Sequence, residues 1–106
     1  MINEDEIWKI IDSKKDIYID LSDRIFDMPE TLYEEFGSVS EHARLLKKEG
    51  FNITESFCGM PTAVLGEAVT NSKGPVIALI GEYDALPELS QKPGKVSYQP
   101  IRKLGN

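Results

Sequence analysis

The first part of the chain has the pattern of a long amphipathic helix. Between residues 4 and 28, apolar side chains recur at intervals of three and four, which places them on one helix face. Lys14 interrupts this face, and its aliphatic stem lets the ammonium group reach solvent. Pro29 ends the predicted helix, because proline lacks an amide hydrogen. So broad an apolar face suits packing on a sheet of the same chain, which we favour, or an interface between copies. It comprises Ile7, Ile10, Ile11, Ile17, Tyr18, Leu21, Ile25 and Met28.

After an acidic connector, a second helix is predicted to begin at Ser38. Ser38 and Glu41 have the spacing of a capping box, in which each side chain accepts a hydrogen bond from the other residue's amide. Lys47 and Lys48 suit the negative end of this helix, and Gly50 suits the left-handed position that follows it.

Beyond Gly50 the period becomes strand-like. Phe51, Ile53 and Phe57 alternate with polar residues, and a second strand is predicted over 62–69. A third strand over 76–81 is continuously apolar, which is typical of a central strand covered on both faces. Residues 88–106 show no period and predict an irregular tail. Two helices followed by three strands predict an α/β fold in one domain spanning residues 1–106.

Charge and cysteine content exclude several classes of partner. The net charge is −6, from 18 acidic residues against 12 Lys and Arg, which argues against nucleic acid and an anionic membrane surface. No apolar run approaches the ~20 residues of a membrane span, and the acidic N-terminus is unlike a signal peptide. Cys58 is the single cysteine, so no internal disulfide forms, and we expect a cytoplasmic location.

The candidate chemistry lies at the end of the apolar third strand. Functional sites in α/β proteins gather beyond the carboxyl ends of strands, and Glu82 and Asp84 stand there. Two residues apart on an extended chain, they face the same side. Such a pair suits metal ligation, orientation of a ligand or acid–base catalysis. A solvated strand end would show the same pattern.

Other reactive residues carry weaker signals. His42 is the sole histidine, and its charged neighbours predict an exposed position on the second helix. Cys58 lies between predicted strands and is expected to be a buried, unreactive thiol. The sequence has no phosphate-binding loop, dinucleotide-binding glycine pattern, Cys-x-x-Cys pair or nucleophile elbow.

Residues 81–91, Gly-Glu-Tyr-Asp-Ala-Leu-Pro-Glu-Leu-Ser-Gln, resemble the strand-end motif of metallopeptidase family twenty. This family includes aminoacylases, carboxypeptidase G, hippurate-type amidohydrolases and p-aminobenzoyl-glutamate hydrolase, and the glutamate–tyrosine–aspartate form is similar to the branch with the last of these. Further segments resemble the family in the same order. They are 21–26, Pro29-Glu30, Glu34-Glu35, Gly50-Phe51 and 59–64.

The resemblance implies the N-terminal part of a mixed-sheet catalytic domain. Members of the family hydrolyse an amide bond in a dipeptide or N-acyl amino acid, using zinc or manganese. Asp84 matches the aspartate that lies beneath the metal and orients a ligand. Glu82 stands where some branches have a metal-binding histidine, so no ligand role carries over to it. The metal-ligand loop of the family follows this motif, beyond residue 106, so we expect this chain alone to hold no metal and to be inactive.

The leading function is therefore that of a metallo-amidohydrolase of which this chain is a part. Its partner would be a small peptide or N-acyl amino acid, and a homo-oligomer is compatible with the apolar helix face. The alternative is a truncated interaction module that binds a partner through an open sheet edge. A third interpretation is an unrelated α/β binding domain.

Overall fold

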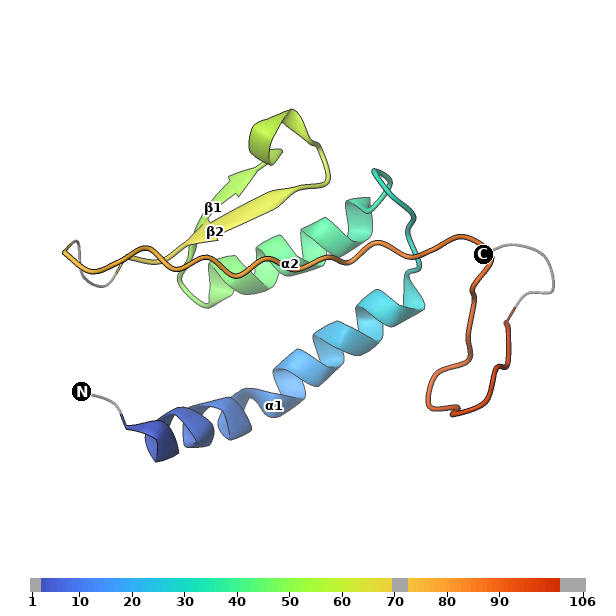
Figure 1. Ribbon diagram of the computed structural model, residues 1–106, viewed down its shortest axis with the longest axis horizontal. Helices are drawn as coiled ribbons and strands as arrows, with labels where there is room; N and C mark the ends of the chain where they lie inside the picture. The colour runs from blue at the N-terminus through green and yellow to red at the C-terminus, as the bar shows by residue number, and fades with distance from the viewer. Residues whose placement is uncertain (1–2, 70–72, 102–106) are drawn as a thin grey trace.

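The computed structural model describes residues 3–69 and 73–101 of the chain. The elements in chain order are α1 (Glu4–Asp27), α2 (Phe36–Lys48), β1 (Asn52–Glu55), a short 3-10 turn η1 (Phe57–Gly59) and β2 (Val64–Glu67). Figure 1 shows α2 between α1 and the β1–β2 hairpin, with the segment after β2 crossing in an extended form. Helices and strands are both present, so the predicted α/β class is confirmed.

Helix α1 forms where the hydrophobic period predicted it. Its capping box lies at Asn3 and Glu6: the Glu6 amide donates to Asn3 Oδ1 at 2.9 Å, and the Asn3 amide donates to Glu6 Oε2 at 3.0 Å. We expected the apolar face to pack on the sheet, but α1 packs on α2 instead. The N-terminal part of the face stays exposed, while Leu21, Ile25 and Met28 are half-buried.

Helix α2 begins at Phe36, two residues before the predicted start. The predicted capping box of Ser38 and Glu41 is wrong. The Ser38 hydroxyl donates to Glu30 Oε1 at 2.6 Å, and Glu41 pairs with Arg24 and Arg44. A carboxylate from the connector forms stronger, charge-assisted bonds with the helix start than a serine hydroxyl does.

The end of α2 follows the prediction. The helix stops at Lys48, and Gly50 adopts φ +93°, the left-handed conformation that glycine accepts without a steric penalty.

Strands β1 and β2 form an antiparallel hairpin in which Asn52 pairs with Glu67 and Glu55 with Val64. Both predicted strands are confirmed, though each is four residues long. Gly66 lets α2 approach the hairpin, because a Cβ there would lie 3.2 Å from Leu46 Cδ1. The thin core lies between α2 and this hairpin. It consists of buried Ala43 and half-buried Val39, Leu45, Leu46, Phe51, Ile53, Val64 and Leu65.

The predicted third strand over 76–81 is wrong for the described structure. This segment has no strand pairing, and Val76 and Leu79 are 98% and 97% exposed. A strand is stabilised by hydrogen bonds to a neighbouring strand, and no described segment supplies one along 76–81. The radius of gyration, 16.7 Å, exceeds the ~13 Å of a compact chain of this length, as expected when an extended segment stays unpacked.

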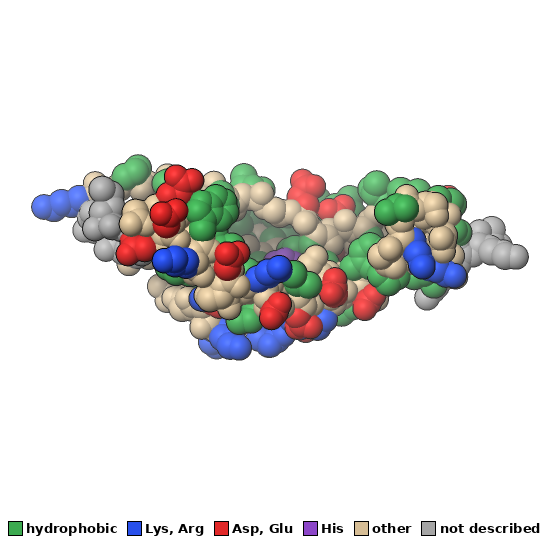
Figure 2. Space-filling view, turned by 90° about the horizontal axis from the view of Figure 1, so that it is seen from below, with side chains coloured by type: hydrophobic (Ala, Val, Ile, Leu, Met, Phe, Trp, Pro, Cys, Tyr) green, Lys and Arg blue, Asp and Glu red, His purple; other side chains and the backbone are tan. Residues whose placement is uncertain are grey.

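The molecule is long and flat, with extents of 53 × 36 × 21 Å. Figure 2 shows a recess across one face, with hydrophobic side chains on its walls and acidic and basic groups interspersed around it. In the described part of the chain, no helix combines the length and the hydropathy needed to cross a bilayer.

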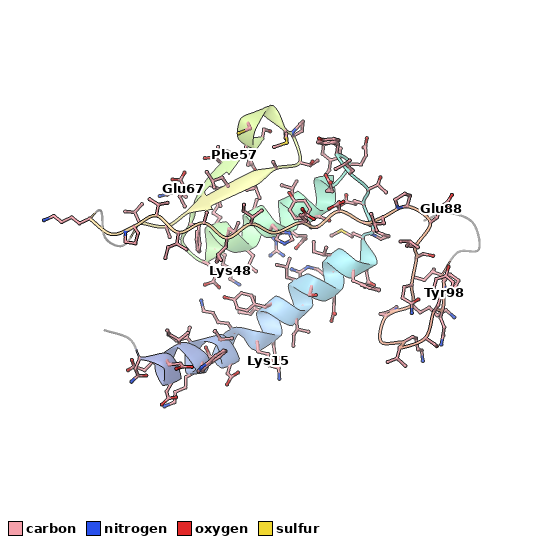
Figure 3. All side chains as sticks on the ribbon, in the orientation of Figure 1. Lys15, Lys48, Phe57, Glu67, Glu88 and Tyr98 are labelled. Carbon is pink, nitrogen blue, oxygen red and sulfur yellow. The ribbon has the colours of Figure 1, made fainter. Side chains whose placement is uncertain are left out.

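Residues 88–101 contain no helix or strand, but side-chain hydrogen bonds order part of them. Gln91 Nε2 donates to the Ser97 carbonyl at 2.9 Å, and the Gln99 amide donates to Gln91 Oε1 at 2.9 Å. Figure 3 shows this loop, marked by Glu88 and Tyr98, at the opposite end of the molecule from the start of α1. Residues 102–106 of the predicted tail lie outside the described residues.

Candidate functional site

The residues around Asp84 alternate in burial as an extended chain should. Glu82 and Asp84 are exposed, whereas Tyr83 and Ala85 are half-buried. Since side chains on an extended backbone point alternately to opposite sides, the two carboxylates share the solvent side. The arrangement leaves Asp84 accessible while the residues on each side of it are held by the protein.

Tyr83 holds the segment on the N-terminal side of Asp84. Its hydroxyl donates a hydrogen bond to the Thr62 carbonyl, and its ring lies 4.8 Å from the His42 ring, tilted by 31°. His42 is fixed in turn by a 2.8 Å hydrogen bond between Nδ1 and the Ser38 carbonyl. The prediction that His42 is exposed is wrong: it is half-buried, because the ring of Tyr83 covers it.

Ala85 holds the segment on the C-terminal side of Asp84. Its amide donates to the Glu30 carbonyl at 2.7 Å, within a parallel bridge between Thr31 and Ala85. The Glu30 carboxylate also accepts from the Gly37 amide at 2.8 Å and from the Ser38 amide at 2.6 Å. Glu30 therefore ties the start of α2 and the Asp84 segment to the same short connector.

Glu35 links the connector to the hairpin. Its buried carboxylate accepts from the Tyr33 amide at 3.0 Å, and it is also hydrogen-bonded to the Thr62 side chain. Thr62 thus contacts both Glu35 and Tyr83. We call this connected group the Asp84 clamp. Its members are Glu30, Glu35, Ser38, His42, Thr62 and Tyr83.

Two clamp carboxyls are held in their charged form. Burial acts to raise the pKa of Glu30, but hydrogen bonds from the Ser38 hydroxyl and the amides of Gly37 and Ser38 outweigh it, so the pKa is lowered. The hydrogen bond from Thr62 lowers the pKa of Glu35 against the opposing effect of burial. Burial, with the negative charges of Glu35 and Glu30 nearby, raises the pKa of Tyr83, so its phenol stays protonated and donates.

The described residues do not by themselves fit a metal ion. Among residues 3–69 and 73–101, no three side chains of His, Cys, Asp or Glu gather closely enough to ligate one. Cys58 is exposed, so the prediction of a buried thiol is wrong. It lies in η1 with φ 55°, where the tight connection between the strands turns it outward.

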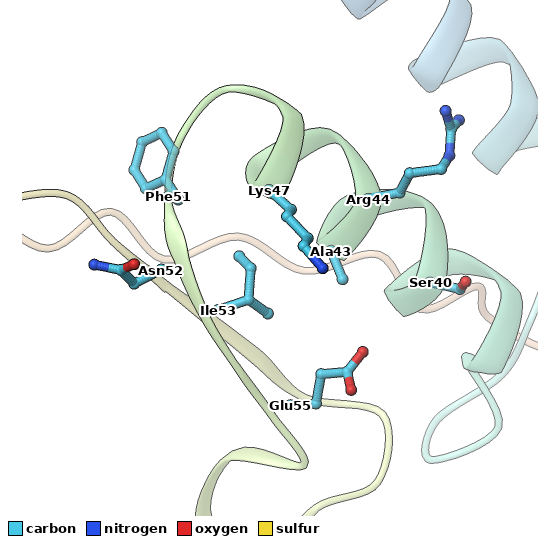
Figure 4. Close-up of a pocket in the computed structure, with 8 residues that line it drawn as sticks. All are labelled: Ser40, Ala43, Arg44, Lys47, Phe51, Asn52, Ile53 and Glu55. Carbon is cyan, nitrogen blue, oxygen red and sulfur yellow. The ribbon is translucent and has the colours of Figure 1, made fainter.

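A separate hollow of about 580 Å³ opens between α2 and β1 (Figure 4). Ala43 and Ile53 lie inside it, and Arg44 and Lys47 line it from α2. These α2 positions lie on the face opposite Ser38 and His42, given the helix period of 3.6 residues. The hollow is therefore not part of the Asp84 clamp.

Comparison with known proteins gives relatives of one kind. The chain is 42% identical over 93 residues, 84% of its length, to a p-aminobenzoyl-glutamate hydrolase subunit of Escherichia coli strain K12. It is 36% and 34% identical over 73 residues, 69% of its length, to thermostable carboxypeptidases 2 and 1 of Saccharolobus solfataricus. Its homologues are metallopeptidase-family-twenty hydrolases. The resemblance expected from the sequence is thereby confirmed.

The matches cover a small part of each relative. The chain spans about one fifth of their length, 19% of the E. coli protein and 18% of each carboxypeptidase. No protein-family model and no solved structure matches the chain. The comparisons therefore show what the chain is related to, and the activity of a whole protein containing it is a matter for proposal.

The sequence indicates Asp84 as a candidate site residue but does not reveal the clamp around it. Glu30 and Glu35 stood in segments that resembled the family, yet neither was assigned a contact. Tyr83 was visible as an aromatic residue between two acids on an extended chain, where alternation would turn it toward the protein. Thr62 also lies in a segment that resembles the family, but its contacts could not be predicted, because its partners are 27 and 21 residues away in the chain.

Proposed function

We propose that this chain is part of a metal-dependent amidohydrolase that cleaves the amide bond of a dipeptide or N-acyl amino acid. The observation that carries the proposal is the 42% identity, over 84% of the chain, to a protein named for hydrolysis of p-aminobenzoyl-glutamate. That compound is an acylated glutamate, and the two other relatives are named as carboxypeptidases. The relatives therefore share the hydrolysis of an amide bond as their named chemistry.

The contribution of this chain to that chemistry is the Asp84 carboxylate. It is exposed and stands on a segment fixed on both sides, which suits a group that must hold one direction. Carboxylates that hydrogen-bond to metal ligands fix the orientation and basicity of those ligands. We assign that orienting role to Asp84.

The metal in this proposal is zinc or manganese, held by residues of the longer protein. When bound, such an ion would lower the pKa of a water molecule and polarise the carbonyl under attack. Since the described residues do not assemble a metal site, we expect the 106-residue chain to be inactive alone. We also propose a cytoplasmic location, on the grounds of its single cysteine.

A chimera tests the proposal. The matching stretch of the E. coli hydrolase is replaced by the corresponding stretch of this chain, and release of p-aminobenzoate and glutamate is measured. We expect activity, because at 42% identity this chain should supply the same structure to the rest of the enzyme. Asp84→Asn should then lower kcat/KM by about 10- to 100-fold.

Asp23→Asn is the matched control, since Asp23 is an exposed aspartate of α1 that is outside the clamp. It should leave kcat/KM unchanged. A folded chimera without activity, or an Asp84→Asn variant as active as its parent, would contradict the proposed function.

A second candidate, an interaction module, is favoured by one observation. Segment 76–80 carries almost fully exposed aliphatic side chains and has no strand pairing. An unpaired segment of this kind can add to the sheet of another protein. The same segment suits a strand paired within a larger hydrolase. An active chimera supports the hydrolase, whereas an inactive chimera, together with an isolated chain that is a stable monomer, supports the module.

A further inference from the structure

The clamp joins the connector and α2, which are consecutive, to two segments that lie farther along the chain. The connector contributes Glu30 and Glu35, α2 contributes Ser38 and His42, the end of the β1–β2 connection contributes Thr62, and the last segment contributes Tyr83. The two residues beside Asp84 carry the contacts that anchor it to this group. The backbone on each side of Asp84 is thus held in place.

Tyr83 has the geometry of the central anchor. Its hydroxyl donates a hydrogen bond to the Thr62 carbonyl, and its ring packs against the His42 ring. Both ends of the side chain are therefore restrained. A tyrosine restrained at ring and hydroxyl loses rotamer freedom, and this fixes the backbone from which Asp84 projects. The supports on the other side are the Glu30 carbonyl and the Ala85 amide, 2.7 Å apart.

We propose that Tyr83 is a positioning residue that sets the direction of the Asp84 carboxylate. His42 supports its ring, and the Glu30 carbonyl holds the other side of Asp84 through the Ala85 amide. The proposal rests on the amidohydrolase function proposed above. It assigns Tyr83 no contact with substrate: its effect passes through Asp84. Two independent measurements follow, one on the structure of the chain and one on catalysis.

The structural measurement is amide hydrogen exchange at Ala85 in the full 106-residue chain. Tyr83→Phe keeps the ring against His42 but removes the hydroxyl that donates to Thr62. We expect exchange at Ala85 to rise by about threefold to tenfold, which corresponds to the loss of one neutral hydrogen bond. Tyr98→Phe is the matched control, since Tyr98 is an exposed tyrosine outside the clamp, and it should leave Ala85 unchanged.

The catalytic measurement is a double-mutant cycle in the chimera. Tyr83→Phe should lower kcat by about threefold to tenfold with KM unchanged. In the Asp84→Asn background, Tyr83→Phe should not lower kcat any further, because the carboxylate through which Tyr83 acts has already been replaced. A residue that merely supports the fold would lower activity by the same factor in both backgrounds.

The outcomes separate this inference from the proposed function. Multiplicative losses in the cycle, or an Ala85 amide that exchanges at the parental rate in Tyr83→Phe, would overturn the positioning role of Tyr83. An unmodified chimera that folds but has no activity would instead overturn the hydrolase proposal. In that case faster exchange at Ala85 would still show that Tyr83 holds the segment.

Discussion

The extended segment 76–80 ends three residues before Tyr83 of the Asp84 clamp, yet the two regions differ in which side chains they bury. In the clamp, Ser38 is 0% exposed, and Glu35 and Thr62 are also buried. In the extended segment, the aliphatic side chain of Val76 is 98% exposed. Burial in this chain therefore follows the availability of partners more closely than it follows polarity.

The physical reason lies in what each region needs. Each polar group of the clamp finds a hydrogen-bond partner among the described residues. No buried side-chain nitrogen or oxygen in that part of the chain lacks one. An apolar strand needs a paired strand at its edge and apolar cover on its faces. Segment 76–80 has neither among the described residues.

The largest expected effect concerns this exposed segment. An uncovered apolar strand with free edges promotes association, so we expect the isolated chain to form oligomers in sedimentation velocity. Leu79→Lys should weaken that association by about tenfold or more, since burying a leucine contributes roughly 1.5–3 kcal/mol. Leu32→Lys, at an exposed leucine of the connector, is the control for added charge. A monodisperse monomer with a sharp, reversible melting transition would contradict this prediction.

The next effect tests the clamp. Ser38→Ala removes the hydroxyl that donates to Glu30 and should reduce the free energy of unfolding by about 1–3 kcal/mol, because a carboxylate loses a partner in a partly buried site. Urea denaturation of the chain measures the loss. Ser40→Ala, two positions along the same helix but exposed, should change the free energy of unfolding far less. Equal effects at the two serines would show that the Ser38 contact contributes little.

The clamp also predicts how stability depends on pH. The pKa values of Glu30 and Glu35 are lowered on folding, so their contribution is complete above the unfolded value near 4.5. It is lost as the pH falls below 4.5 and through the folded values. The free energy of unfolding should therefore decline steeply below about pH 4.5.

Glu30→Gln should be less stable at neutral pH and should show a shallower decline in acid, as measured by urea denaturation at several pH values. Glu34→Gln serves as the comparison, because Glu34 is exposed and is not part of the clamp. An acid limb that is the same in Glu30→Gln and in the parent would indicate that other carboxyls control the acid transition.

The smallest effect is expected where α1 meets the end of α2. Lys14 pairs with Glu49, and this hydrogen bond and charge raise the pKa of Lys14. The pair lies at the surface, where solvent and salt screen it. Lys14→Gln should thus shift the denaturation midpoint only slightly, and adding salt to about 0.5 M should remove the difference. A shift as large as that of Ser38→Ala would place this pair among the main contacts of the fold.

The sequence alone determined the elements whose signals are local. A helix period carried by many residues fixed α1, and the glycine after Lys48 and Glu49 fixed the end of α2. Alternating residues fixed the hairpin, and the motif at 81–91 pointed to the family to which the relatives belong. Each of these signals lies within a short stretch of chain, so spacing is enough to detect it.

The tertiary structure alone decided the contacts between distant segments. Glu30, eight residues before Ser38, caps the start of α2, because the fold brings its carboxylate within hydrogen-bond distance of the Ser38 amide. The burial of His42 depended on Tyr83, and the exposure of 76–80 depended on the absence of paired strands among the described residues. The hydrophobic pattern indicates which segments need strand pairing and apolar cover. Whether another segment supplies them depends on the tertiary structure.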